Sequence, residues 1–266
     1  MSDNSTENGL PISIFPPVSG GNSSRAKITL VTGSSRGIGR GIALALARDG
    51  FSVAINYLNN REKAEILSSE ITKLGQKSLI FQANVTKSDQ VSSLIASVVK
   101  EFGCLSVLVN NVGPFRMKSI YDSDEQDWME MIQGNLTSAF LCTRTALPHI
   151  RYTKGSIIFI GAPNAEQLRA APHTGAYTIA KNGVVALAKT LAREEAKHSV
   201  RVNVVNPGFI NTGNMTALDI KEQSSQVPLG RVGTVEDIAE AVSFLVSERA
   251  SYITGAVLNV SGGLWV

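Results

Sequence analysis

The sequence has few cysteines and few histidines, which argues against a metal centre or a disulfide framework. Its 266 residues include two cysteines, Cys104 and Cys142, and neither lies in the spacing of a metal site. The three histidines, His149, His173 and His198, do not cluster. Reduced, buried cysteines are typical of cytoplasmic proteins. We therefore predict a cytoplasmic protein with no bound metal.

The chain also lacks a strong excess of charge and any long apolar run. Its net charge is +3, and no run of basic residues indicates a nucleic-acid surface. No uncharged apolar stretch approaches the roughly 18 residues that span a bilayer. Hydrophobic residues make up 43% of the chain and charged residues 18%, as in ordinary globular proteins. We therefore predict no nucleic-acid partner and no membrane span, and the length suits one α/β domain.

Residues 1–25 lack the periodic apolar pattern of the rest of the chain and are rich in Ser, Asn, Gly and Pro. We predict that they form a flexible N-terminal arm and that residues 26–266 form one domain. A basic start followed by an apolar core would indicate a signal peptide, and the segment has neither. Its acids and its single Arg, Arg25, argue against a transit peptide. The alternative is an arm that packs against a partner subunit.

From residue 27 onward, short apolar runs alternate with stretches of helical periodicity. This alternation is typical of βα units, which require a parallel sheet covered by helices on both faces. We therefore predict an α/β fold, a doubly wound Rossmann-type parallel sheet of seven strands in a single domain. The predicted strands are 28–31, 52–57, 79–81, 105–110, 156–160, 201–205 and 256–260. After a first helix that follows strand 28–31, the predicted helices are about 64–74, 87–102, 123–149, 177–197 and 234–246.

A glycine-rich turn follows the first predicted strand. It runs Thr32-Gly33-Ser34-Ser35-Arg36-Gly37-Ile38-Gly39 and leads into a helical pattern that closes at Gly50. In such a turn, backbone N–H groups and the helix N-terminus can approach a pyrophosphate closely. The spacing is G-x3-G-x-G rather than the commoner G-x-G-x-x-G. A glycine turn that binds no ligand is the alternative.

Tyr177 and Lys181 lie four residues apart in a predicted helix, so their side chains share one face. An ammonium beside a phenol stabilises the phenolate and lowers the pKa of the phenol from about 10. A tyrosine with a lowered pKa can exchange a proton with a carbonyl or an alcohol near neutral pH. Taken alone, the spacing also suits a tyrosine packed in the core beside a solvated lysine.

Together with further motifs, these two features resemble the short-chain dehydrogenase/reductases, and among them most of all the 3-oxoacyl-[acyl-carrier-protein] reductases. The resemblance covers about residues 26–266. It is carried by the glycine turn at 32–39, Asn84-Val85, Asn110-Asn111-Val112-Gly113, Asn135, Tyr177-x3-Lys181, Asn206-Pro207-Gly208-Phe209-Ile210, Tyr252-Ile253-Thr254-Gly255 and Val260-Ser261-Gly262-Gly263.

The resemblance implies an enzyme that reduces a ketone to an alcohol with a nicotinamide cofactor. Tyr177 would donate the proton, and Lys181 would hold the nicotinamide ribose and lower the pKa of Tyr177. Asn135 would hold a water that relays protons, although by itself it suits a buried polar residue bonded to backbone. The residues implied to line the cofactor are Gly33, Ser34, Ser35, Arg36, Gly37, Ile38, Gly39, Asn56, Asn84, Val85, Asn111, Val112, Gly113, Tyr177, Lys181, Pro207, Gly208 and Ile210.

The predicted cofactor is NADPH. A site for NAD usually has an acid at the end of the second strand, where it binds the ribose 2′-hydroxyl. Here that strand ends with Asn56-Tyr57, and no acid is present. Arg36, and as a further candidate Arg61, would meet a 2′-phosphate, which the arginine fork binds well. A solvated Arg61 at the start of a helix is the alternative.

One departure from the family concerns a serine that binds the substrate oxygen. The family places it thirteen residues before the tyrosine, and counting back from Tyr177 gives Asn164. Aligning the end of strand 156–160 instead gives Ala162, and the following loop is then two residues longer than usual. Neither residue is Ser, so Asn164 is a candidate catalytic residue only on the first alignment. Val112 also replaces the usual Ala of the Asn-Asn-Ala-Gly motif.

The resemblance leaves the function open among three possibilities. The first is a reductase of a 3-oxoacyl thioester in fatty acid biosynthesis, with acyl carrier protein as a further partner. The second is a cofactor-binding protein with weak or lost catalysis, and the third is a reductase of a steroid, sugar or small alcohol. The substrate would lie among loops 114–121, 163–174 and 211–226. A homotetramer is implied, through the helices around Trp128 and Tyr177 and the C-terminal Leu264-Trp265-Val266.

Overall fold

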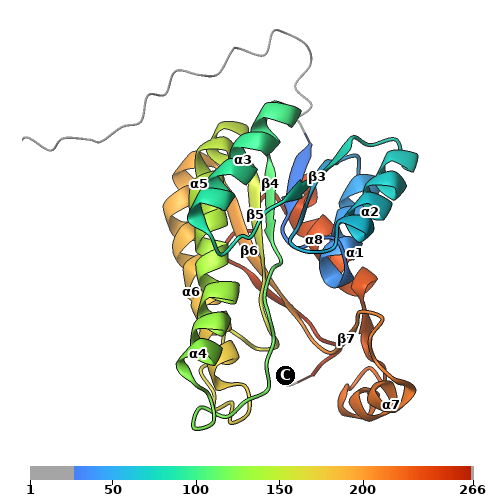
Figure 1. Ribbon diagram of the computed structural model, residues 1–266, viewed down its shortest axis with the longest axis vertical. Helices are drawn as coiled ribbons and strands as arrows, with labels where there is room; N and C mark the ends of the chain where they lie inside the picture. Colours follow the sequence, from blue (N-terminus) through green and yellow to red (C-terminus); the bar gives the residue numbers. More distant parts are fainter. Residues whose placement is uncertain (1–26, 265–266) are drawn as a thin grey trace, which may run out of the picture.

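The computed structural model describes residues 27–264, which fold around one seven-stranded sheet (Figure 1). The strand order is β3-β2-β1-β4-β5-β6-β9, and every neighbouring pair is parallel. This confirms the predicted doubly wound fold. The predicted arm, residues 1–25, lies outside the described residues, as do residues 265–266. The strands of this sheet are β1 (Ile28–Val31), β2 (Ser52–Tyr57), β3 (Ser78–Gln82), β4 (Val107–Asn110), β5 (Ser156–Ile160), β6 (Arg201–Pro207) and β9 (Val257–Val260).

Helices cover both faces of the sheet (Figure 1). Helices α1, α2 and α8 lie on one face, where α1 and α8 pack closely against each other, and α3, α5 and α6 lie on the other. Two clusters of buried apolar residues fill the spaces between the layers, one on each face of the sheet. The helices are α1 (Gly37–Arg48), α2 (Arg61–Lys73), α3 (Ser88–Phe102), α4 (Glu125–Met131), α5 (Ser138–Thr153), α6 (Gly175–Glu195), α7 (Ala217–Gln226) and α8 (Val235–Val246).

The central strands are buried because both of their faces are covered. All residues of β1, β4 and β5 are buried, and these strands are dominated by Ile, Leu and Val. Continuous apolar runs of this kind are typical of parallel sheets with helices on both sides. The chain order reverses at β1, which lies between β2 and β4. Ligands of such sheets bind at this reversal, beyond the carboxyl ends of the strands.

Two elements differ from the prediction. The helix predicted over residues 123–149 contains a π-helical turn, Ile132–Thr137, between α4 and α5. Such a turn adds a residue to the helical repeat and often occurs at functional sites. Residues 211–226, predicted as a loop, include α7, whose start is capped by Thr216 and Asp219. No residue of α7 is buried, so its sequence lacks the apolar stripe from which helices are predicted.

The C-terminal end of the chain corrects one further expectation. Leu264 is 1% exposed and packs within its own chain, so it is not an apolar residue left free for a partner. Trp128 of α4 is 38% exposed. Among residues 27–264, every helix is too short or too polar to cross a bilayer.

Candidate active site

The glycine turn between β1 and α1 leaves no room for side chains. Gly33 and Gly37 have φ angles of +62° and +56°, a region that favours glycine. A Cβ added to Gly39 would lie 2.5 Å from Nδ2 of Asn111 and 2.9 Å from the carbonyl oxygen of Gly33. Arg36, at the N-cap of α1, is exposed and its side chain does not cap the helix. The first N–H groups of α1 therefore have no side-chain cap in the turn.

The side chains of two asparagines are hydrogen-bonded to the backbone of this turn. The Oδ1 of Asn56 accepts a hydrogen bond from the Gly33 N–H at 3.1 Å, and its Nδ2 donates to the Ala83 carbonyl at 3.1 Å. The Nδ2 of Asn111 donates to the Thr32 carbonyl at 2.8 Å. Asn56 is 1% exposed, so it shapes the turn through Gly33 rather than facing solvent.

The other residues implied to line the cofactor lie along the same edge of the sheet. Ser34 and Ser35 are buried in the turn, and Ile38 packs on the core from the first turn of α1. The remainder follow the ends of strands: Asn84 and Val85 after β3, Val112 and Gly113 after β4, Pro207 and Gly208 at the end of β6, and Ile210 in the short strand β7 (Ile210–Asn211), which pairs with β8 (Gly233–Thr234). A glycine cradle, an uncapped helix N-terminus and this row of strand ends fit a dinucleotide.

Tyr177 and Lys181 lie near the start of α6, and Lys181 approaches Gly113 and Asn135. Lys181 is 4% exposed, and its Nζ donates to the Ile160 carbonyl at 2.7 Å. A Cβ added to Gly113 would collide with Oδ1 of Asn135 and would lie 3.0 Å from Nζ of Lys181. Both polar atoms therefore lie near one point beside Gly113, and that residue must remain glycine.

Asn135 lies in the π-helical turn and is 1% exposed. Its Nδ2 donates to the carbonyls of Met131 and Pro114, each at 3.0 Å. Its Oδ1 is buried and has no hydrogen-bond partner among the described residues. A buried polar atom without a partner costs free energy unless a ligand or a water satisfies it. The arrangement suits an Oδ1 that accepts a hydrogen bond from a bound molecule.

The predicted lowering of the Tyr177 pKa is wrong for this geometry. Burial raises the pKa of Tyr177 to about 12 and lowers the pKa of Lys181 to about 8. The Lys181 ammonium lies 5.8 Å from the centre of the Tyr177 ring and donates instead to the Ile160 carbonyl. Desolvation therefore outweighs the attraction between ammonium and phenolate, since it opposes the charged form of both groups. Near neutral pH, Tyr177 carries its hydroxyl proton.

The position of the family serine is occupied by buried residues without a hydroxyl. Ala162 is 6% exposed, follows β5 and packs in the same apolar cluster as Tyr177. Asn164 is 3% exposed and has a φ angle of +52°. Asparagine adopts this left-handed conformation more readily than most residues. On the strand alignment Ala162 stands where the family serine is expected, and Asn164 lies in the following turn; on the count back from Tyr177 the position is that of Asn164.

The contacts made by loop 114–121 could not be predicted from the sequence pattern. The ring of Phe115 meets that of Tyr177 edge-on, with centres 5.0 Å apart, although Phe115 is 61% exposed. Within the same loop, the backbone N–H of Lys118 donates to the His173 carbonyl at 2.7 Å, so loop 114–121 is joined to the start of α6. Arg116 and Lys118 also pair with Asp127 of α4, and the Lys118 ammonium holds the pKa of that carboxyl below its usual value. These contacts link residues distant in sequence, which periodicity does not indicate.

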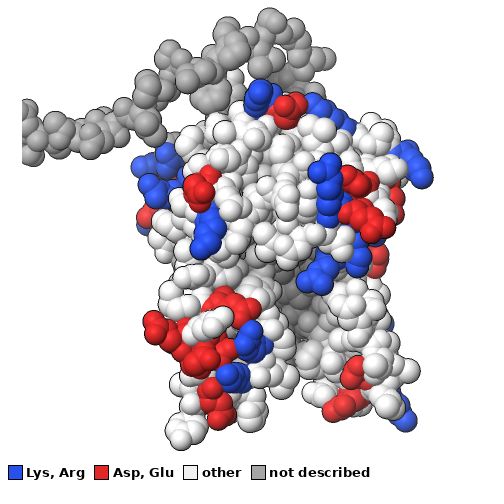
Figure 2. Space-filling model, viewed as in Figure 1, with Lys and Arg blue, Asp and Glu red and all other residues white. Residues whose placement is uncertain are grey.

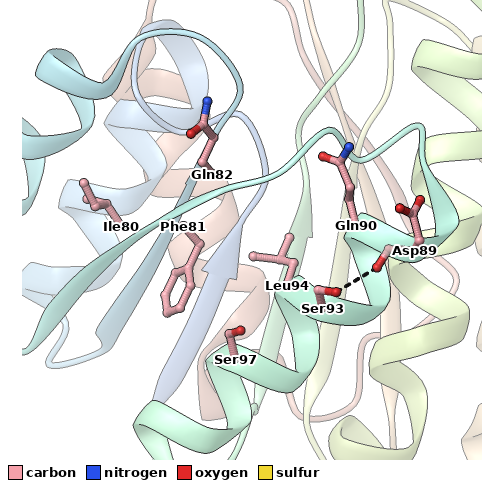
Figure 3. A pocket seen from close by; sticks show the side chains of 8 residues that line it. All are labelled: Ile80, Phe81, Gln82, Asp89, Gln90, Ser93, Leu94 and Ser97. Atoms are coloured by element: carbon pink, nitrogen blue, oxygen red, sulfur yellow. Dashed lines mark hydrogen bonds between the residues drawn. The ribbon is translucent and has the colours of Figure 1, made fainter.

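A hollow in the surface lies between the part of the molecule that carries α4 and the part that carries α7 (Figures 1 and 2). Figure 2 shows that the walls of this hollow are mostly uncharged, whereas charged side chains of both signs lie on the outer surface. A cavity of about 610 Å³ beside α6 is lined by residues of the predicted substrate loops, including Ile120, Leu168 and Pro172. Another cavity, of about 310 Å³, lies between β3 and α3 (Figure 3). It contains none of the predicted site residues.

Comparisons with known proteins agree with this geometry. The model of a family described as enoyl-(acyl carrier protein) reductase matches residues 33–265. The 3-oxoacyl-[acyl-carrier-protein] reductase FabG of Staphylococcus aureus (strain Mu50) is 43% identical over 248 residues, which cover 90% of this chain and 98% of that protein. The 3-oxoacyl-[acyl-carrier-protein] reductase of Synechocystis is 38% identical over 240 residues, covering 90% and 97%.

Solved structures show the same fold. A short-chain dehydrogenase/reductase from Serratia marcescens has a TM-score of 0.85 at 32% identity and covers 90% of this chain and 98% of its own. A dehydrogenase/reductase from Sinorhizobium meliloti has a TM-score of 0.84 at 31% identity, with coverage of 90% and 95%.

Proposed function

Because the chain belongs to the short-chain dehydrogenase/reductase family of NAD(P)-dependent oxidoreductases, we propose that it reduces a 3-oxoacyl thioester to the 3-hydroxy product with NADPH. The observation that carries this proposal is the convergence of Lys181 and Asn135 beside Gly113 at the carboxyl edge of the sheet, with the centre of the Tyr177 ring 5.8 Å from the Lys181 ammonium. The similarity to 3-oxoacyl-[acyl-carrier-protein] reductases over nine-tenths of the chain supports the choice of substrate.

The proposed mechanism assigns one task to each of these side chains. The bound nicotinamide supplies a hydride to the carbonyl carbon. The Tyr177 hydroxyl then donates its proton to the forming alkoxide, and its raised pKa keeps the donor protonated near neutral pH. Lys181 holds the cofactor ribose. The unpartnered Oδ1 of Asn135 holds a water that returns a proton toward Lys181 and Tyr177.

NADPH is proposed over NADH because β2 ends in Asn56 and Tyr57, both buried and neither an acid. Arg36 is exposed beside the glycine turn and is the residue proposed to bind the 2′-phosphate. Arg61 is the weaker candidate, because its Nε donates to Glu65 at 2.7 Å. Dissociation constants for both cofactors test the choice, and tighter binding of NADH would reject it. Arg36→Ala should weaken NADPH binding more than Arg61→Ala does.

The proposed substrate class is tested by measuring the rate of NADPH oxidation. Purified protein is mixed with NADPH and acetoacetyl thioesters, and loss of absorbance of the reduced nicotinamide is followed. Saturable turnover of the thioester, faster than that of steroid, sugar and small-ketone controls, is the expected result. Faster turnover of another class of carbonyl compound would support the reductase function but would reject a 3-oxoacyl thioester as the substrate.

A second candidate function, cofactor binding with weak catalysis, is favoured by one observation. The place of the family serine is filled by Ala162, which cannot donate a hydrogen bond to the substrate oxygen. Losing such a donor typically costs about 10²–10³-fold in rate. Tight NADPH binding together with no turnover on any carbonyl would establish this alternative.

We also propose a cytoplasmic homotetramer that accepts substrate from acyl carrier protein. The partly exposed Trp128 on α4 supports an association surface on that side of the molecule. Light scattering at micromolar concentration tests the assembly, and a monomer mass would reject it.

A further inference from the structure

The loop that joins β5 to α6 begins with two tight turns that carry the family-serine positions. The Ala165 N–H donates to the Ala162 carbonyl at 3.1 Å, and the Gln167 N–H donates to the Asn164 carbonyl at 3.0 Å. Ala162, Asn164 and Ala165 are all buried. The first part of segment 162–168 is therefore folded onto the protein, whereas Gln167 and Leu168 at its end are exposed.

A carboxylate ties this segment to the sheet. Oε2 of Glu166 accepts a hydrogen bond from Nδ2 of Asn206 at 2.8 Å, and its Oε1 accepts one from Nδ2 of Asn259 at 2.6 Å. Asn206 of β6 and Asn259 of β9 are paired in register, and Asn206 Nδ2 also lies 3.1 Å from Asn259 Oδ1. We call these three residues the Glu166 clamp.

The clamp has a steric requirement at Gly161, directly after β5, and a second attachment on α6. A Cβ added to Gly161 would collide with Oδ1 of Asn206, so glycine at this position makes room for the asparagine. On the other side, Nδ2 of Asn182 donates to the carbonyls of Ala165, at 2.5 Å, and Gln167, at 3.2 Å. Asn182 directly follows Lys181. The segment is thus held between the sheet and the helix that carries the catalytic pair.

We propose that Glu166 is a positioning residue for the carbonyl substrate. Its clamp fixes segment 162–168, whose Ala162 and Ala165 belong to the apolar cluster against which Tyr177 packs. The fixed segment then places the substrate in a site that lacks the family serine. The inference rests on the proposed reductase function. A carboxylate suits the task because it accepts from both amide groups at once, whereas a glutamine would present an N–H to one of them.

The first test is Glu166→Gln, with Glu101→Gln, an exposed position on α3, as a control that removes the same charge. We expect KM for the ketone to rise about tenfold in Glu166→Gln, with kcat and the cofactor dissociation constant each changed less than twofold. A rise in KM alone indicates lost positioning of substrate. A parallel loss of kcat and of cofactor affinity would indicate general damage and would overturn the proposal, as would an unchanged KM.

The second test reverses one hydrogen bond of the clamp. In Glu166→Gln with Asn259→Asp, the glutamine N–H donates to the new carboxylate, and Asn206 still donates to both residues. We expect the double variant to recover KM to within threefold of the wild type. Asn259→Asp alone opposes two carboxylates and should raise KM at least as much as Glu166→Gln. Failure of the double variant to recover would overturn the proposal.

Amide hydrogen exchange separates this inference from the proposed reaction. If the wild type reduces none of the ketones, the reductase proposal fails, and exchange in segment 162–168 still tests the clamp. Faster exchange there in Glu166→Gln, reversed in the double variant, supports the clamp, and equal exchange in all variants overturns it.

Discussion

The cofactor edge and the substrate side of this protein are built from different kinds of contact. Around the glycine turn, backbone groups bond to buried Asn56 and half-buried Asn111, and neighbouring atoms exclude any side chain from Gly39. On the substrate side, loop 114–121 and α7 expose large apolar residues such as Phe115, Met117 and Leu218. The contrast indicates that one region is constrained by hydrogen bonds and steric exclusion, while the other is free to change with the substrate.

Replacing Tyr177, which is proposed to act between the cofactor and the substrate, should have the largest effect on activity. Tyr177→Phe removes the proposed proton donor but keeps the ring, so kcat should fall about 10²–10⁴-fold. The cofactor dissociation constant should change less than twofold. Steady-state kinetics and fluorescence titration measure both, with Tyr252→Phe, at a fully exposed position outside the substrate loops, as the control. Retention of most of the activity would show that another group donates the proton.

Adding a methyl group to the glycine turn should chiefly weaken cofactor binding. Gly39→Ala puts Cβ against Asn111 and the Gly33 carbonyl, and overpacking of this kind costs about 1–3 kcal/mol. We expect NADPH affinity to fall roughly 10–100-fold. Gly41→Ala is the matched control, because its Cβ would instead meet Val235 at 3.1 Å on the α8 side. Equal affinities of the two variants would contradict the steric account of the turn.

The buried ammonium of Lys181 predicts a pH dependence of stability. Its pKa is about 8 in the folded protein and ordinarily 10.5, so the unfolded chain binds more protons between these values. Stability from this group therefore rises with pH across that window, by about 1–3 kcal/mol between pH 8 and 10. Urea unfolding of wild type and Lys181→Met isolates the effect, because the raised pKa values of Tyr177 and Cys142 are common to both. A difference that does not change with pH would rule out the lowered pKa.

The smallest predicted effect is a gain on the substrate side. Ala162→Ser restores a hydroxyl after β5, and kcat/KM should rise about tenfold, equivalent to about 1.4 kcal/mol. Asn164→Ala should then have little effect. If Ala162→Ser brings no gain while Asn164→Ala removes a brisk wild-type activity, the amide of Asn164 is the donor and the strand alignment is misleading.

The sequence predicted the sheet and the glycine turn well because both depend on local patterns. Apolar strands such as β5 and glycines with positive φ are recognisable from neighbouring residues alone. The pairing of Tyr177 with Lys181 was also predicted from spacing. The sign of the Tyr177 shift was not, because helical spacing gives the neighbour but not the degree of burial.

Other features depend on residues far apart in the chain. Glu166 and Asn259 are separated by 93 positions, and no periodicity connects them. Phe115 approaches Tyr177 because loop 114–121 is joined to the start of α6 through Lys118. The helix α7 was missed because it buries no residue, so it lacks the pattern on which prediction depends.

The two sides of the hollow are held unequally: loop 114–121 is bonded to the start of α6, whereas α7 buries no residue. This difference bears on the path by which molecules enter and leave. Loop 114–121 is joined to α6 by Lys118 and cannot swing outward without breaking that contact. Helix α7 has no buried residue, so moving it away exposes little new apolar surface. Molecules should therefore enter and leave the hollow on the α7 side. Access would then be set by the architecture of the entrance rather than by the chemistry at Tyr177.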